Sequence, residues 1–78
     1  MTNLTLKLDS IERIKKFNST VTKFHCDFDL EQGRYFIDAK SMMGLLSLDL
    51  NSPIELHFQA SEDEEKSILS SLTDFILE

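Results

Sequence analysis

Alternating apolar and polar residues predict four β-strands along the chain. The first two strands are expected over 4–8 and 26–30, and the others over 35–39 and 54–60. The turn at 31–34 contains Gly33, whose freedom to adopt a positive φ suits a tight hairpin between the second and third strands. Each strand therefore has one apolar face, although the adjacent Tyr35, Phe36 and Ile37 leave the buried face of the third strand ambiguous.

Apolar residues spaced by three and four positions predict a helix over about 10–24 and another after Ser61. We expect Asp9, with Glu12 three residues later, to cap the first helix. Ser41 is expected to cap a short helix over 42–48, and Ser61 with Glu64 has the pattern of a capping box. The expected buried positions of the two longer helices are Ile11, Ile14, Phe17, Val21 and Phe24, and then Ile68, Leu69, Leu72, Phe75 and Ile76.

The resulting order, β-α-β-β-α-β-α, predicts an α+β fold. It is a two-layer open-faced β-sandwich, in which three helices cover one face of a four-stranded antiparallel sheet. The 78 residues are the length of one small domain, so we expect a single domain over 1–78. A chain of this length has too little core to enclose a buried cofactor as well, and no cofactor is expected.

The charge balance argues against direct binding of nucleic acid, because 14 acidic residues oppose 8 lysines and arginines for a net charge of −6. Arg13, Lys15 and Lys16 gather on the first helix, without the interleaved aromatic residues of a nucleic-acid surface. The chain has no apolar run of membrane-spanning length, and the segment 1–8 lacks the features of a secretion signal. With a lone Cys26, these features predict a cytoplasmic protein with no membrane association.

Neither an enzyme nor a metal site is expected. Asp27 and Asp29 share an open strand face that would do little to shift their protonation, and the acidic run 62–65 is a solvated helix start. His57 is expected on the solvent-facing side of the fourth strand. Since His25 and Cys26 lack ligand spacing to it, a metal site through these three residues is disfavoured.

The segment 39–48, Ala-Lys-Ser-Met-Met-Gly-Leu-Leu-Ser-Leu, lies between the third and fourth strands and resembles the HPr family. HPr is the histidine-containing phosphocarrier of the bacterial sugar phosphotransferase system. The resemblance runs from Gly33 to the end of the chain and is strongest to HPr of Gram-positive bacteria. It implies an HPr-like fold and Ser41 as the target of a regulatory kinase. It also implies that neighbouring residues dock the HPr kinase or, after phosphorylation, a transcription regulator: Lys40, Met42, Met43, Leu45 and Leu46.

The first third of the chain departs from this family. HPr carries its histidine in a Gly-Leu-His-x-Arg-Pro loop at the start of the first helix. Here no histidine precedes His25, and 1–32 contains neither glycine nor proline. Matching the apolar positions of the helix places Ser10 near the histidine's position. Because a serine ester transfers phosphate poorly, Ser10 is a weak phosphoacceptor candidate, and transfer through histidine is expected to be absent.

Two interpretations of Ser41 are compatible, a helix cap and a phosphorylation site. The apolar residues after it cannot all point inward, so some form a partner surface, a dimer contact or an incompletely buried edge. We therefore expect a non-catalytic regulatory or adaptor protein, monomeric or weakly homodimeric, that binds a protein partner through 41–48 and is switched at Ser41. The alternatives are a phosphocarrier with an acceptor outside the family pattern and a constitutive structural or oligomeric scaffold.

Overall fold

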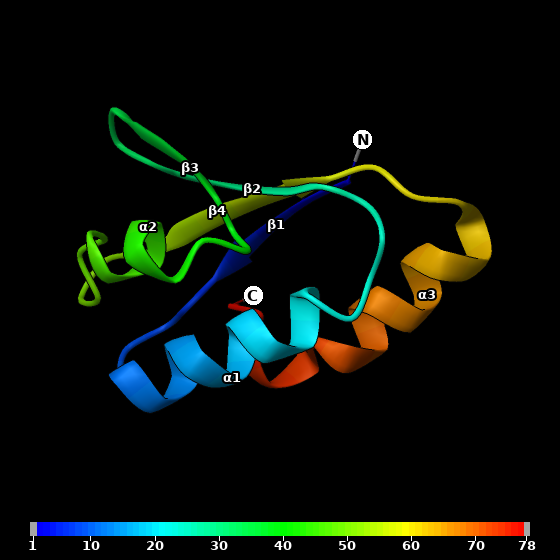
Figure 1. Ribbon diagram of the computed structural model, residues 1–78, viewed down its shortest axis with the longest axis horizontal. Coiled ribbons are helices and arrows are strands. Elements are labelled where there is room, and N and C mark those ends of the chain that lie inside the picture. The colour runs from blue at the N-terminus through cyan, green and yellow to red at the C-terminus, as the bar shows by residue number, and fades with distance from the viewer. Residues whose placement is uncertain (1, 78) are drawn as a thin grey trace.

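The computed structural model describes residues 2–77, which form one sheet with helices on a single side of it (Figure 1). The elements in chain order are β1 (Thr2–Leu6), α1 (Ile11–Val21), β2 (Phe28–Gln32), β3 (Tyr35–Asp38), α2 (Met42–Leu46), β4 (Ile54–Phe58), α3 (Glu62–Ser71) and a 3-10 turn η1 (Thr73–Phe75). The strands pair antiparallel in the order β1-β4-β2-β3. This arrangement confirms the predicted α+β open-faced sandwich.

The core lies between the inner face of the sheet and the helices, as the alternation of the strands requires. α1 and α3 lie beneath the sheet, and α2 packs against α1 and β3 (Figure 1). Phe17 of α1 and Phe75 of η1 meet edge to face with their ring centroids 5.8 Å apart. The largest fully buried side chains are Phe17, Phe28, Phe58, Leu6, Leu8, Ile14, Leu30, Leu45, Ile54, Leu56, Ile68 and Leu72. Within residues 2–77, no helix is both long and apolar enough to cross a membrane.

The first strand lies two residues earlier than the alternation of leucines predicts, over Thr2–Leu6 instead of 4–8. Leu8 is fully buried, but it lies beyond the sheet. The pairing of β1 with β4 ends at Leu6, and the backbone amide of the next residue, Lys7, donates to the Phe75 carbonyl at 2.9 Å. Ile76 then bridges Leu6, so the C-terminal segment covers this end of the β1 edge.

Both ends of the first helix differ from the prediction. Ser10, not Asp9, is the N-cap, since its hydroxyl accepts a hydrogen bond from the Arg13 amide at 3.2 Å. The helix ends at Val21 instead of 24, because the Lys23 and Phe24 amides bond three residues back instead of four. Ile11, expected in the core, is exposed.

The hairpin between β2 and β3 turns at Gly33, which has the predicted positive φ, 60°. β2 begins and ends two residues later than expected, at Phe28 and Gln32, and β4 stops at Phe58. The side-chain amide of Gln32 forms two hydrogen bonds of 2.8 Å with the Asp49 backbone. It donates to the Asp49 carbonyl and accepts from the Asp49 N–H, which fastens the hairpin to the loop after α2.

Candidate functional site

Ser41 lies at the N-cap of α2, where the sequence places it. Its extended backbone lets the hydroxyl oxygen accept a hydrogen bond from the Gly44 amide at 3.3 Å, while its carbonyl accepts one from Leu45 at 3.0 Å. The Ser41 amide donates to the Asp38 carbonyl at 3.0 Å, so the residue is anchored to the end of β3. Ser41 is nevertheless exposed, and its hydroxyl is therefore both fixed in position and open to solvent.

The apolar residues of α2 divide between two sides of the helix. Met43 is 85% exposed and Leu46 is 53% exposed, and their spacing of three places them on one side. Met42 and Leu45, also three apart, take the adjacent, inward side: Leu45 is fully buried and Met42 packs against the core. The expected contribution of Leu45 to a docking surface is thus wrong, because its side chain is part of the core. We call Ser41, Met43 and Leu46 the α2 surface.

Lys40, also expected to contact a partner, is engaged within the fold. Its ammonium group donates to the Phe24 carbonyl at 2.8 Å and lies 5.8 Å from the centre of the Phe28 ring. The Lys40 carbonyl accepts a hydrogen bond from the Asn18 side chain of α1 at 3.0 Å. Lys40 and Asn18 therefore hold α2 against α1, and they position Ser41 without belonging to the exposed surface.

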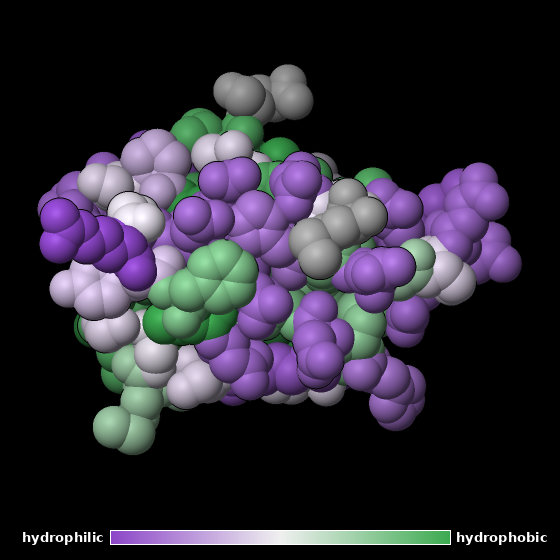
Figure 2. All heavy atoms as spheres, turned by 90° about the horizontal axis from the view of Figure 1, so that it is seen from above, coloured by the Kyte–Doolittle hydropathy of each residue, from purple (hydrophilic) through white to green (hydrophobic). Residues whose placement is uncertain are grey.

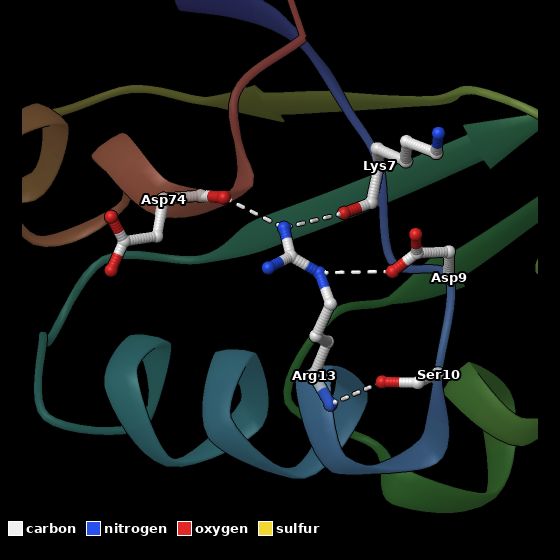
Figure 3. A network of polar contacts seen from close by, with 5 residues as sticks. All are labelled: Lys7, Asp9, Ser10, Arg13 and Asp74. Atoms are coloured by element: carbon white, nitrogen blue, oxygen red, sulfur yellow. Dashed lines mark hydrogen bonds and ion pairs between the residues drawn. The ribbon is translucent and has the colours of Figure 1, made fainter.

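At the start of α1 the chain has Ser10 and Arg13, and Arg13 is bound to the backbone on two sides (Figure 3). One guanidinium nitrogen donates to the carbonyl of Lys7 at 3.1 Å and to that of Asp74 at 2.7 Å. Its Nε lies 3.1 Å from a carboxylate oxygen of Asp9, an ion pair without hydrogen-bond alignment. The guanidinium also lies 5.1 Å from the centre of the Phe75 ring. Arg13 thus joins β1, α1 and the C-terminal segment.

Ser10 and Arg13 are both engaged in hydrogen bonds within the fold. The Ser10 hydroxyl caps the helix, and Nη2 of Arg13 donates to two carbonyl oxygens. Lys16, one turn further on, joins Ser10 and Arg13 around a shallow hollow. The histidines are elsewhere: His25 follows the other end of α1 and His57 belongs to β4.

The structure does not bring His25 and Cys26 to a ligand group with His57. His25 is exposed, and Cys26 is half-buried and unpaired. Burial, and to a lesser degree the Glu64 carboxylate, raises the pKa of the Cys26 thiol above its ordinary value. This environment is that of a packing residue and not of an activated nucleophile.

The sequence interpretation missed the surroundings of His57. Its side chain is on the outer face of the sheet, as expected, but it is only 15% exposed. Glu31 and Glu55 lie next to it. Among residues 2–77, these three form a cluster whose side-chain atoms are of the types that bind metal ions and lie close together. Glu55 and His57 share a strand face two residues apart, which the sequence shows. The proximity of Glu31 depends on the register of β2 against β4, which the sequence does not show.

A family model and several solved structures match this chain. The family model described as PTS HPr component phosphorylation site matches residues 12–78. A crystal structure of HPr-C-His from Thermoanaerobacter tengcongensis superposes with a TM-score of 0.75 at 22% identity, over 95% of this chain and 89% of that one. The phosphocarrier protein HPr of Bacillus anthracis gives 0.65 at 21% identity, over 90% and 94% of the two chains. A search among curated proteins found no match.

A further structural relative is the Bacillus subtilis catabolite repression protein Crh, described as a domain-swapped, intertwined dimer. Its TM-score is 0.63 at 23% identity, over 100% of this chain and 93% of that one. The fold, with its three serine-capped helices, is thus a small open-faced β-sandwich like that of HPr. The chain belongs to the PTS-HPr family. The part of the chain that matches the family model begins at residue 12, two residues after Ser10.

Proposed function

We propose that this protein is a non-catalytic regulatory or adaptor member of the HPr family, which binds a protein partner through the α2 surface and is switched by phosphorylation of Ser41. The observation that carries the proposal is the exposed Ser41 hydroxyl at a fixed cap, next to the exposed Met43 and Leu46. Flexible methionine and leucine side chains on a surface favour docking of a partner.

Phosphorylation at Ser41 is compatible with the local structure. The hydroxyl acts only as an acceptor toward the Gly44 amide, and a phosphate oxygen at the same place preserves that role. The modification adds nearly two negative charges beside an apolar surface. A partner with an arginine beside an apolar pocket would therefore distinguish the two forms.

The start of α1 supports a role without histidine phosphotransfer. Ser10 stands near the position where the HPr resemblance requires a histidine, and one nitrogen of the Arg13 guanidinium, Nη2, donates to two backbone carbonyls. A seryl phosphate is a stable ester, so Ser10 is a poor carrier even when phosphorylated. The same argument makes a phosphocarrier with Ser10 as its acceptor the weaker alternative.

The proposal is tested by the initial rate at which a Gram-positive HPr kinase transfers phosphate from ATP to the purified protein. Met43→Ser and Leu46→Ser are expected to lower this rate at least about tenfold, the effect of losing roughly 1.4 kcal/mol of docking energy. Ile11→Ser is the matched control, because Ile11 is 54% exposed but lies on α1. Absence of phosphorylation, or equal rates for all variants, contradicts the proposal.

An oligomeric scaffold is a second candidate, favoured by the description of the Crh relative as an intertwined dimer. Sedimentation of the unmodified protein over a range of concentrations separates the two. A dimer that persists at low concentration, together with no effect of the kinase, supports the scaffold; a monomer supports the adaptor.

A further inference from the structure

Five side chains from all four strands meet on the outer face of the sheet, away from the α2 surface. β1 contributes Asn3, β2 Glu31, β3 Phe36, and β4 both Glu55 and His57. The register pairs Asn3 with His57, Glu31 with Glu55, and Glu31 with Phe36, which places all five on the same face. Figure 2 looks onto this face and shows mainly hydrophilic side chains around a small hydrophobic group.

The imidazole of His57 is held in a defined orientation within this group. The Phe36 ring stacks on it with 5.9 Å between centroids and 4° between planes. Nδ1 forms a hydrogen bond with the amide oxygen of Asn3. With that oxygen as the acceptor, Nδ1 is the donor, and Nε2 on the other side of the ring forms a second hydrogen bond, with the Glu31 carboxylate. Nε2 lies 3.1 Å from a carboxylate oxygen of Glu31 and 4.0 Å from one of Glu55.

Acidic side chains gather around Nε2 of His57. The carboxylates of Glu31 and Glu55 both lie near Nε2, and the two residues are directly opposite each other on neighbouring strands, where like charges destabilise a sheet. Asp29, opposite His57 on β2, adds a further negative charge to the face. Within residues 2–77, the ion pairs that Glu31 and Glu55 form are those with His57. The cluster therefore requires a cation at Nε2, either a proton or a metal ion.

We propose that Glu31, Glu55 and His57 bind a divalent transition-metal ion, with Zn²⁺ as the best fit. Their three ligand atoms lie within 4.8 Å of one another. A tetrahedral zinc site with bonds of about 2.0–2.2 Å has ligand atoms about 3.3–3.6 Å apart. The separations of 3.1 Å and 4.0 Å from Nε2 thus need only small rotations of the two glutamates. Water would complete the coordination from the solvent side.

The chemistry of these ligands selects among metals. One imidazole with two carboxylates suits Zn²⁺, Co²⁺ or Ni²⁺ better than Ca²⁺ or Mg²⁺, which take mainly oxygen ligands. Two carboxylate charges balance a divalent ion. The hydrogen bond from Nδ1 to Asn3 is the outer contact that orients a metal-binding histidine. A bound ion would link β2 to β4, the two central strands of the sheet.

The test is calorimetric titration of the untagged protein with Zn²⁺ at neutral pH, with the visible absorption of Co²⁺ as a second readout of coordination. We expect one ion per chain. His57→Gln and Glu55→Gln should each weaken binding at least about tenfold. Glu55 is exposed, so its variant retains the fold even where the His57 variant does not. Circular dichroism of each variant verifies folding.

Two control variants address the other candidate ligands. His25→Gln removes the second histidine and Cys26→Ser removes the thiol, and both should bind Zn²⁺ like the unmodified protein. The proposal is overturned if no saturable binding is seen below about 1 mM Zn²⁺, because a proton then suffices to neutralise the cluster. It is equally overturned if the controls lose binding while His57→Gln retains it, which would place the ion at His25 and Cys26.

Discussion

Replacing Arg13 by alanine is expected to lower the free energy of unfolding by more than is usual for a partly exposed residue. The guanidinium makes hydrogen bonds to the Lys7 and Asp74 carbonyls, each worth roughly 1 kcal/mol after allowance for solvent exposure. Its contact with the Phe75 ring adds about 0.5–1 kcal/mol. The ion pair with Asp9 adds less than about 1 kcal/mol. The expected loss is thus about 2–4 kcal/mol.

Such a loss is a large share of the total for a domain of 78 residues, for which about 4–12 kcal/mol is typical. The assay is equilibrium unfolding in urea followed by circular dichroism, with the slope of the transition used to verify that both variants unfold in the same way. A thermal melt should show a decrease of at least about 8 °C.

Three variants separate the contributions of Arg13. Asp9→Asn removes only the ion pair and should cost less than about 1 kcal/mol. Arg13→Lys keeps the charge but lacks the forked donor geometry, so it should be intermediate. Lys16→Ala changes an exposed cation one turn away and should be neutral within about 0.5 kcal/mol. If Arg13→Ala costs no more than Lys16→Ala, Arg13 does not fasten β1 to the C-terminal segment and the reasoning is refuted.

Two further predictions concern residues with defined burial. Leu45→Ala should cost about 2–5 kcal/mol in urea unfolding because Leu45 is fully buried, whereas Leu46→Ala should change stability by less than about 0.5 kcal/mol; equal effects would contradict the division of α2 into two sides. Burial raises the pKa of the Cys26 thiol, so less thiolate is present at a given pH and alkylation by iodoacetamide at pH near 8 should be slower than that of a small free thiol. Equal rates would show that the thiol is not shielded.

Much of the fold could be predicted because its signals are local. Ser41 and Ser61 cap their helices as expected, and Gly33 turns the hairpin, since each depends on a few neighbouring residues. The error at the start of α1 comes from a competing contact of the expected cap. Asp9 matched the capping pattern, yet its carboxylate pairs with Arg13, and Ser10 caps α1 instead.

The surroundings of the candidate sites depend on contacts between distant parts of the chain. Ser41 could be identified from its sequence surroundings, but the inward direction of Leu45 depends on how α2 packs against the core. The environment of His57 depends on the pairing of β4 with β1 and β2 and on Phe36 from β3. A strand pattern indicates which residues share a face, and it does not indicate which residues of other strands lie beside them.

The central claim is that the protein has exchanged histidine phosphotransfer for serine regulation, and one measurement tests it directly. The intact mass is determined for the purified protein after incubation with ATP and a Gram-positive HPr kinase, and in parallel with phosphoenolpyruvate and the general enzyme of the phosphotransferase system. The account predicts one added phosphate from ATP, absent in Ser41→Ala, and none from phosphoenolpyruvate. An acid-labile phosphate from phosphoenolpyruvate, or an ATP-derived phosphate that remains in Ser41→Ala, would contradict it.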